Sequence, residues 1–177
     1  MEEVTLLNRQ DKPDGNPEDG RIVLCGHNDT VKEINRRKMA DLSGREYIYT
    51  ADVTDEKHNG ISDGINWGVD KELTLKEGAS VIMLKNDSKR NGSRWINGTI
   101  GIIKRLLKNE IMVTVNGLDY PVYRETWTAK EFEYDKNRKK LIARTIAKLT
   151  QFPVKLAWAF TIHKSQGQTF DKVLIDL

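Results

Sequence analysis

Short apolar runs separated by turn residues dominate the middle of the chain. Four such runs occupy residues 79–84, 98–104, 111–115 and 120–124. Asn-Gly pairs, which favour tight turns, stand at 91–92, 97–98 and 116–117. Closely spaced short strands with turns of this kind predict a small antiparallel β-barrel or β-sandwich.

The segment before these strands has the pattern of an α/β fold. Residues 21–25 (RIVLC) form an apolar run that predicts a buried strand. Apolar positions at helical spacing follow over residues 28–42, with Asn28 or Asp29 as a candidate cap and Gly44 where a helix would end. Residues 46–50 (EYIYT) predict a second strand. A strand–helix–strand unit indicates part of a parallel sheet.

The last third of the chain returns to longer apolar segments. The spacing of apolar residues over 140–150 (KLIARTIAKLT) predicts a helix. Residues 152–160 (FPVKLAWAF) and 172–177 (KVLIDL) predict buried strands, whereas the polar residues 52–70 predict a long connection. The chain is therefore expected to leave an α/β sheet, build a β-module and return to the sheet.

The composition is that of a globular protein, and the distribution of charge gives one indication of a binding partner. The 177 residues are 38% hydrophobic and 31% charged, with a net charge of +3, which is typical of a globular protein. Residues 1–20 carry six acids and two bases, whereas 85–108 carry seven bases and one acid and 136–148 carry six bases and no acid. The two basic blocks indicate either a polyanion partner or a solvated loop and helix face.

Several classes of protein are excluded by the residue counts. Cys25 is the one cysteine, which excludes a disulfide framework, and three scattered histidines add no zinc cluster. No apolar run approaches the length of a membrane span. The acidic, polar N-terminus does not have the pattern of a signal peptide, so we expect an intracellular protein, cytoplasmic if bacterial.

The most informative chemistry follows the run at 152–160. The next residues, TIHKSQGQT, put hydroxyl, imidazole and ammonium groups at the end of a predicted buried strand, where open α/β sheets place ligands. Such groups bind phosphates, and Gly167 permits close approach of a ligand to the backbone. From the residues alone, anion binding and a polar helix start both remain open.

These residues also carry a resemblance to a known family. The run LAWAFTIHKSQGQTFDKV resembles motif V of superfamily 1B DNA helicases, the Pif-type and RecD-like enzymes. The run RIVLCGHNDTVKEIN resembles their motif IV region, a strand followed by a helix that contains an Asn. The runs LKEGASVIMLKND and WINGTIGII resemble the opening of the SH3-like module inserted in their second RecA-like domain. The resemblance covers roughly residues 21–177.

The resemblance implies an α/β fold with a partial RecA-like parallel sheet (domain 2A) and an inserted SH3-like antiparallel β-module (domain 2B). Residues 1–20 would be an acidic tail or linker. Residues 21–72 would form the first part of domain 2A and residues 73–150 the module 2B. Residues 151–177 would be the return segment of domain 2A, with motif V.

The resemblance also implies roles for individual residues. In the family, motif V contacts the backbone of single-stranded DNA, through positions that match Thr161, His163, Lys164 and Ser165. Its Gly-Gln end faces the ATP cleft and matches Gly167 and Gln168. Further candidates for DNA contact are His27, Asn28, Arg94 and Asn97. Capping of a helix is an equal alternative for Asn28. Trp95, in the basic turn with Arg94 and Asn97, is expected either to stack on DNA or to lie in the barrel core.

Motor elements that the family requires are not found in the sequence. It contains no Gly-Lys-Ser or Gly-Lys-Thr loop for phosphates. Residues 55–58 (DEKH) look like a DExH box, but no buried strand is predicted before them. Motif VI, with its arginine finger, is also absent. We therefore expect a helicase fragment without catalytic residues of its own.

The functional expectation is the DNA-gripping, cleft-forming half of an ATP-dependent 5′-to-3′ DNA helicase, with roles in repair or recombination. ATP and Mg²⁺ would bind the full-length parent, and no tightly bound cofactor is expected on the fragment. Its partners would be single-stranded DNA and the missing N-terminal RecA-like domain, with no membrane and no zinc. One alternative is a stand-alone single-stranded nucleic-acid-binding or regulatory module. Another is a peptide-binding SH3-like domain, although the four Trp residues show no grouping in sequence.

Overall fold

The computed structural model describes residues 22–55, 60–87, 93–135, 139–162 and 173–176. Contacts divide the chain into two compact units. The α/β unit combines the segment up to Asp41 with the segment from Leu156 onward, and the β unit comprises Leu42–Lys155. The β unit is thus inserted between two segments of the α/β unit. The limits predicted for domains at 21–72, 73–150 and 151–177 stay predictions.

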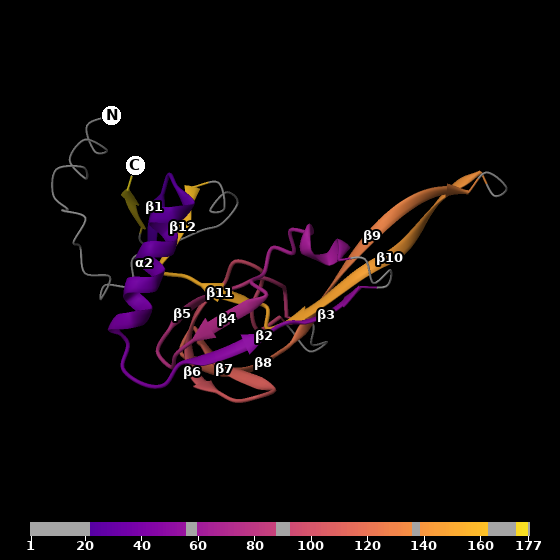
Figure 1. The fold of residues 1–177 in the computed structure, drawn as a ribbon. Helices are drawn as coiled ribbons and strands as arrows, with labels where there is room; N and C mark the ends of the chain where they lie inside the picture. Colours follow the sequence, from indigo (N-terminus) through magenta and orange to yellow (C-terminus); the bar gives the residue numbers. More distant parts are fainter. Residues whose placement is uncertain (1–21, 56–59, 88–92, 136–138, 163–172, 177) are drawn as a thin grey trace. The chain divides into compact units, whose positions relative to one another are not determined.

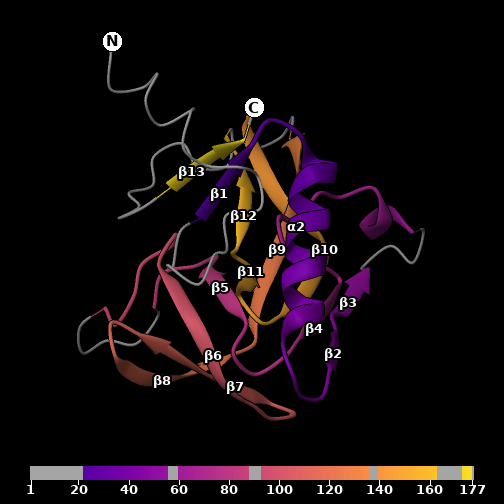
Figure 2. The same cartoon turned by 90° about the vertical axis from the view of Figure 1, so that its left-hand side faces the viewer.

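A three-stranded parallel sheet forms the centre of the α/β unit, in the order β12-β1-β13. Its elements are β1 (Ile22–Cys25), α2 (Asn28–Asp41), β12 (Ala159–Thr161) and β13 (Val173–Asp176). Both neighbours of β1 come from the last part of the chain (Figure 2). Helix α2 packs against β1 and β12. The helix predicted for residues 28–42 is confirmed.

The core of this unit is small and apolar. Val23, Cys25 and Ala159 are buried, and Val31 and Ile34 of α2 pack against them. The opposite side of α2 carries exposed ion pairs between residues three apart, such as Arg36 with Glu33 at 2.7 Å. The helix is therefore amphipathic, with one face toward the sheet and one toward solvent.

A five-stranded sheet in the order β11-β5-β6-β7-β8 forms much of the β unit. Its strands are β5 (Ser80–Met83), β6 (Ile100–Leu106), β7 (Glu110–Val115), β8 (Leu118–Tyr123) and β11 (Val154–Leu156). The four strands predicted between residues 79 and 124 are confirmed, with ends shifted by a few residues. Asn116 and Gly117 both have positive φ, 50° and 79°, as the predicted Asn-Gly turn between β7 and β8 requires.

Two further strand groups complete the β unit. Strands β2 (Tyr47–Thr50) and β4 (Glu72–Leu75) pair antiparallel. Strands β3 (Asp52–Asp55), β9 (Glu125–Asp135) and β10 (Lys140–Gln151) form a sheet in the order β3-β10-β9. The long hairpin of β9 and β10 extends past β3 (Figure 1). A short 3₁₀ helix, η2 (Ile61–Asp63), lies between β3 and β4.

The helix predicted over residues 140–150 is wrong, because these residues form β10. The register in which β10 pairs with β9 shifts between Thr145 and Ala147. A β-bulge at this point interrupts the alternation of side chains between the two faces of the strand. Ala147 and Leu149 are buried beyond the bulge, whereas Leu141 before it is exposed. The bulge thus produces an apolar spacing that resembles the helical period.

Other local predictions also need correction. The strand at 46–50 was expected in the parallel sheet, but β2 pairs antiparallel with β4. The connection at 52–70 contains β3 and η2. β3 is exposed along Asp52–Thr54, so it is not the buried strand that a DExH box requires.

The last two predicted strands also differ from the structure. Residues 152–160 divide into β11 and β12, which belong to different sheets. The strand at 172–177 exists as β13, but it is not buried, since Val173 and Ile175 are exposed at the outer position of a three-stranded sheet. Within the described part of the chain, no helix has the length and apolar character of a membrane span.

Candidate nucleic-acid interface

The carboxyl ends of the parallel strands meet at one edge of the α/β unit. In the register of the sheet, Cys25 at the end of β1 lies beside Thr161 at the end of β12. His27 and Asn28 follow β1 after Gly26 and are exposed, whereas Thr161 is buried. The structure therefore brings three of the predicted contact residues to one edge, where open α/β sheets bind ligands.

Helix α2 begins at this edge. The backbone N–H of Val31 donates to the carbonyl of His27 at 3.3 Å, so His27 occupies the cap position and Asn28 is the first helical residue. The free N–H groups of a first helical turn favour anions, and Asn28 in this turn has an exposed side chain. The edge thus offers backbone as well as side-chain donors.

Asn35 positions β12 relative to α2. Its Oδ1 accepts the backbone N–H groups of Trp158 and Ala159 at 3.2 and 3.1 Å, and its Nδ2 donates to the carbonyl of Ala159 at 3.1 Å. The resemblance includes an Asn in this helix but gives it no role. A polar residue on the apolar face of a helix was the signal in the sequence that could have identified it.

The edge differs in charge from one side to the other. Asp176, at the end of β13, lies beside Cys25 in the register. Burial, and secondarily the Asp176 carboxylate, raise the pKa of the Cys25 thiol. The β13 side therefore carries an acid. The β12 side continues in the sequence to His163 and Lys164, which lie outside the described residues.

The remaining candidates, Arg94 and Asn97, belong to the β unit. Arg94 bonds Asp87 through Nε at 2.6 Å and Nη2 at 2.8 Å, and its guanidinium lies 4.4 Å from the centre of the Trp95 ring. This hydrogen-bonded pair raises the pKa of Arg94. The side chain of Asp87 is only 2% exposed. The charge of Arg94 is therefore largely matched within the protein.

Trp95 and Asn97 have different environments. Trp95 is buried, so of its two expected roles the structure favours a place in the core. Asn97 is exposed, and its backbone N–H donates to Oδ1 of Asn86 at 2.7 Å.

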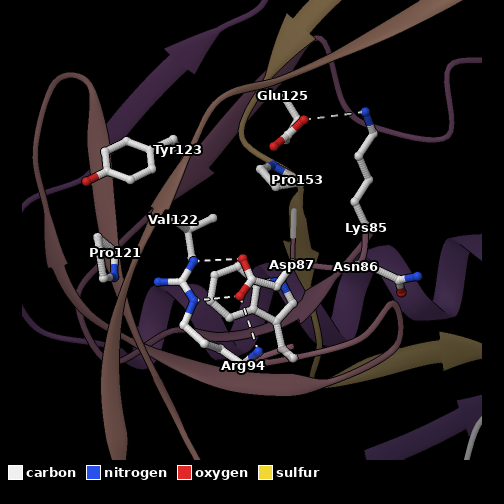
Figure 3. Close-up of a pocket in the computed structure, with 10 residues that line it drawn as sticks. Lys85, Asn86, Asp87, Arg94, Pro121, Val122, Tyr123, Glu125 and Pro153 are labelled. Carbon is white, nitrogen blue, oxygen red and sulfur yellow. Dashed lines mark hydrogen bonds and ion pairs between the residues drawn. The ribbon is translucent and has the colours of Figure 1, made fainter. Parts of the chain in front are cut away.

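A pocket lies beside the pair of Arg94 and Asp87 (Figure 3). It is lined by Lys85, Asn86, Asp87, Arg94, Trp95, Pro121, Val122, Tyr123, Glu125 and Pro153. Lys85 Nζ donates to the carbonyl of Thr126 at 2.7 Å and lies 3.9 Å from Glu125. The two cationic side chains of the pocket, Lys85 and Arg94, thus bond to acceptors within the protein. The net charge of the pocket lining is therefore close to zero.

Five predicted site residues lie outside the described residues: His163, Lys164, Ser165, Gly167 and Gln168. The described part of the chain contains no group of three or more His, Cys, Asp or Glu residues that could hold a metal ion.

Comparison with known proteins identifies similar sequences. The chain is 32% identical over 172 residues to the ATP-dependent DNA helicase Pif1 of Campylobacter jejuni, covering 92% of this chain and 37% of that protein. It is 30% identical over 158 residues to human PIF1, covering 87% of this chain and 23% of that protein. The chain thus spans well under half of the length of these relatives. No protein-family model matches it.

Solved structures give the same result. Unliganded Pif1 from Bacteroides sp matches with a TM-score of 0.80 and 32% identity, over 99% of this chain and 39% of that one. Bacteroides Pif1 bound to single-stranded DNA matches with a TM-score of 0.71 and 33% identity, over 98% and 38% of the two chains. The predicted resemblance and the predicted fold class, a RecA-like sheet with an inserted β-module, are confirmed.

Proposed function

We propose that this chain forms the DNA-gripping and cleft-forming half of an ATP-dependent superfamily 1B helicase. It is homologous to Pif1 DNA helicases along 92% of its length. The parent protein is an enzyme, and this chain represents one part of it. The proposed ligand of the chain itself is the backbone of single-stranded DNA.

One observation carries this proposal. The parallel register of Cys25 with Thr161 brings the end of β1 and the end of β12 to the same edge. His27 and Asn28 follow the first strand, and His163, Lys164 and Ser165 follow the second in sequence. Hydroxyl, imidazole and ammonium groups with helix N–H donors form a set that suits phosphodiesters. The homology supplies the identity of the polymer, because a Pif1 structure contains single-stranded DNA.

The proposed mechanism uses this edge as one of two grips. Thr161, His163, Lys164 and Ser165 hold the strand, and His27 and Asn28 add contacts beside them. ATP and Mg²⁺ would bind the whole protein between this sheet and a second RecA-like domain. By analogy with the family, Gly167 and Gln168 face the nucleotide and couple its binding to the grip. Alternate gripping then moves the protein in the 5′-to-3′ direction.

Arg94 and Asn97 are proposed as secondary contacts from the β unit. Because Asp87 engages Nε and Nη2 of Arg94, the proposed contact uses the remaining nitrogen, Nη1. These two residues are therefore expected to contribute less than the edge of the parallel sheet.

Removing the Thr161 hydroxyl tests the proposal at a described residue. Thr161→Val keeps the shape and the strand preference of the side chain but removes the phosphate donor. We expect the affinity for a single-stranded oligonucleotide to fall about 10- to 150-fold, as a hydrogen bond to a charged group implies. Thr74→Val, in β4 of the β unit, is the matched control and should bind like the parent chain. Equal affinities for all three proteins would contradict the proposed contact.

The alternative of an independent binding module differs in its dependence on other domains. If the chain is a motor part, it should bind DNA but show no DNA-stimulated ATP hydrolysis until the first RecA-like domain of a Pif1 relative is joined to it. Binding with no gain of hydrolysis in a folded fusion would favour the independent module.

A further inference from the structure

The long hairpin of β9 and β10 separates aromatic and acidic residues onto opposite faces. Paired residues of an antiparallel ladder point to the same side, and side chains alternate along each strand. Lys130 pairs with Thr145, Phe132 with Ala143, and Tyr134 with Leu141. We call the side formed by these six residues the aromatic face.

The intervening residues form the opposite side of the same ribbon, here called the charged face. Glu131 pairs with Arg144, and Glu133 pairs with Ile142. Arg144 also lies 3.4 Å from Glu133. Toward the base of the hairpin this side continues into the core, where Ala147 and Leu149 are buried. The acids of this part of β9 are thus confined to one face.

Large apolar side chains on the aromatic face are exposed. Phe132 is 67% exposed, Tyr134 56% and Leu141 66%. At the base of the hairpin this side is polar, where the hydroxyls of Thr126 and Thr150 bond at 2.9 Å. The core therefore does not require these aromatic residues. An exposed apolar cluster of this kind marks a contact surface.

We propose that the aromatic face of the β9–β10 hairpin binds the bases of single-stranded nucleic acid by stacking on Phe132 and Tyr134, with Lys130 on a flanking phosphate. This proposal deepens the proposed function, on which it rests, by adding a contact surface on the β unit.

The chemistry of the face selects this ligand. Phe132 and Tyr134 are two residues apart on one strand, so their rings stand about 6.7 Å apart along it. That spacing allows one base on each ring of a chain that is not self-stacked. Sheet aromatics bind bases in this way in common RNA-binding modules, and exposed aromatics with cations are typical of single-strand binders.

Charge complementarity favours a polyanion over an acidic or neutral protein surface. Lys130 is the charged residue among the six that form the aromatic face, and Glu131 and Glu133 point to the other side. A polyanion on the aromatic face therefore meets a cation and is separated from the acids by the ribbon itself.

The test is equilibrium binding of a labelled oligothymidylate of about 20 nucleotides to the full chain. Phe132→Ala and Tyr134→Ala should each weaken binding by about 5- to 150-fold, the range found for loss of one base stack. Ile142→Ala, on the charged face of the same hairpin, is the matched control and should leave affinity unchanged. Because Phe132 and Tyr134 are exposed, the variants should keep the parent's melting temperature.

A second pair of variants tests the cation. Lys130→Ala should lower the slope of log affinity against log salt by about 0.7. Lys140→Ala removes the same charge from the opposite face and should change the slope less. Equal effects of the two lysines would indicate only a general electrostatic attraction and would overturn the face-specific contact.

The outcomes separate this proposal from the proposed function. If the parent chain binds and the aromatic variants bind equally well, the hairpin proposal is overturned. The grip at the parallel sheet then stands, and the aromatic face would instead contact a protein. If aromatic variants weaken binding while neither Thr161→Val nor Lys164→Ala with His163→Ala does, the hairpin contact stands and the grip fails. If the folded parent chain does not bind, both fail.

Discussion

The side chain of Asn35 holds the backbone of Ala159, 124 residues further along the chain. Oδ1 accepts the Ala159 N–H at 3.1 Å, and Nδ2 donates to the Ala159 carbonyl at 3.1 Å. The amide is 8% exposed, so these bonds form away from solvent. They fix the start of β12 against the helix that follows β1. The relative positions of His27 and Thr161 therefore depend on the hydrogen bonds of Asn35 to Ala159.

Replacing Asn35 by Ala is expected to destabilise the α/β unit. The change removes three hydrogen bonds and leaves backbone groups of half-buried Trp158 and buried Ala159 without this partner. We expect the free energy of unfolding to fall by about 2–4 kcal/mol, measured by urea denaturation. Arg36→Ala, at the neighbouring exposed position, should cost less than about 1 kcal/mol. A similar loss for both variants would contradict the positioning role.

Gly101 in β6 has no room for a side chain. A Cβ atom there would lie 2.5 Å from Cγ1 of Val113 and 2.9 Å from the carbonyl oxygen of Thr114. Gly101→Ala should therefore lower the melting temperature of the β unit, by an amount that corresponds to about 1–3 kcal/mol. Gly64→Ala is the control, since its nearest neighbour is the Ile61 carbonyl oxygen at 3.8 Å. An unchanged melting temperature for Gly101→Ala would show that β6 and β7 are not packed as described.

The Cys25 thiol should make stability depend on pH in the alkaline range. Its pKa in the folded chain is raised above the ordinary value of a cysteine thiol by burial and by Asp176. As the pH rises through the lower, unfolded value, the unfolded thiol ionises and the folded one does not. Stability therefore falls, by at most about 1.4 kcal/mol per pH unit. Urea titrations at pH values from below to above the pKa of the unfolded thiol measure this effect. The free energy of unfolding should decline more steeply with pH for the parent chain than for Cys25→Ala. Parallel declines would contradict the buried, neutral thiol.

Arg94 allows structural and ligand roles to be separated. Arg94→Ala leaves the almost fully buried carboxylate of Asp87 without its main partner, at a cost of about 3 kcal/mol or more. The double variant Arg94→Leu with Asp87→Leu removes both charges and should recover much of that stability. If the double variant is stable and keeps its affinity for single-stranded DNA, Arg94 is structural. A stable double variant with weakened binding would support the proposed contact through Nη1.

The sequence predicted elements well where local pattern and tertiary structure agree. The Asn116-Gly117 turn and the β7–β8 hairpin follow from conformational preferences of the turn residues themselves. Helix α2 follows from a regular apolar period and a glycine just beyond its end. In these places no long-range contact was needed to select the structure.

The predictions from sequence were wrong or incomplete where contacts between residues far apart in the chain determine the structure. The bulge between Thr145 and Ala147 in β10 changes which side chains face the core, and only pairing with β9 stabilises that arrangement. The role of Asn35 depends on Ala159, which no local pattern connects to it. Arg94 counted as a free cation in the sequence, but the structure pairs it with Asp87, seven positions earlier.

The most direct test of the proposed grip is the salt dependence of binding to a single-stranded oligonucleotide. Lys164→Ala with His163→Ala should weaken binding and lower the slope of log affinity against log salt by about 0.7 for each phosphate that is no longer neutralised. Arg37→Ala removes a charge from the part of α2 that lies farther from His27. Its slope should stay closer to that of the parent chain. A folded parent chain that fails to bind, or a double variant with the parent's affinity and slope, would contradict the claim that this edge grips DNA.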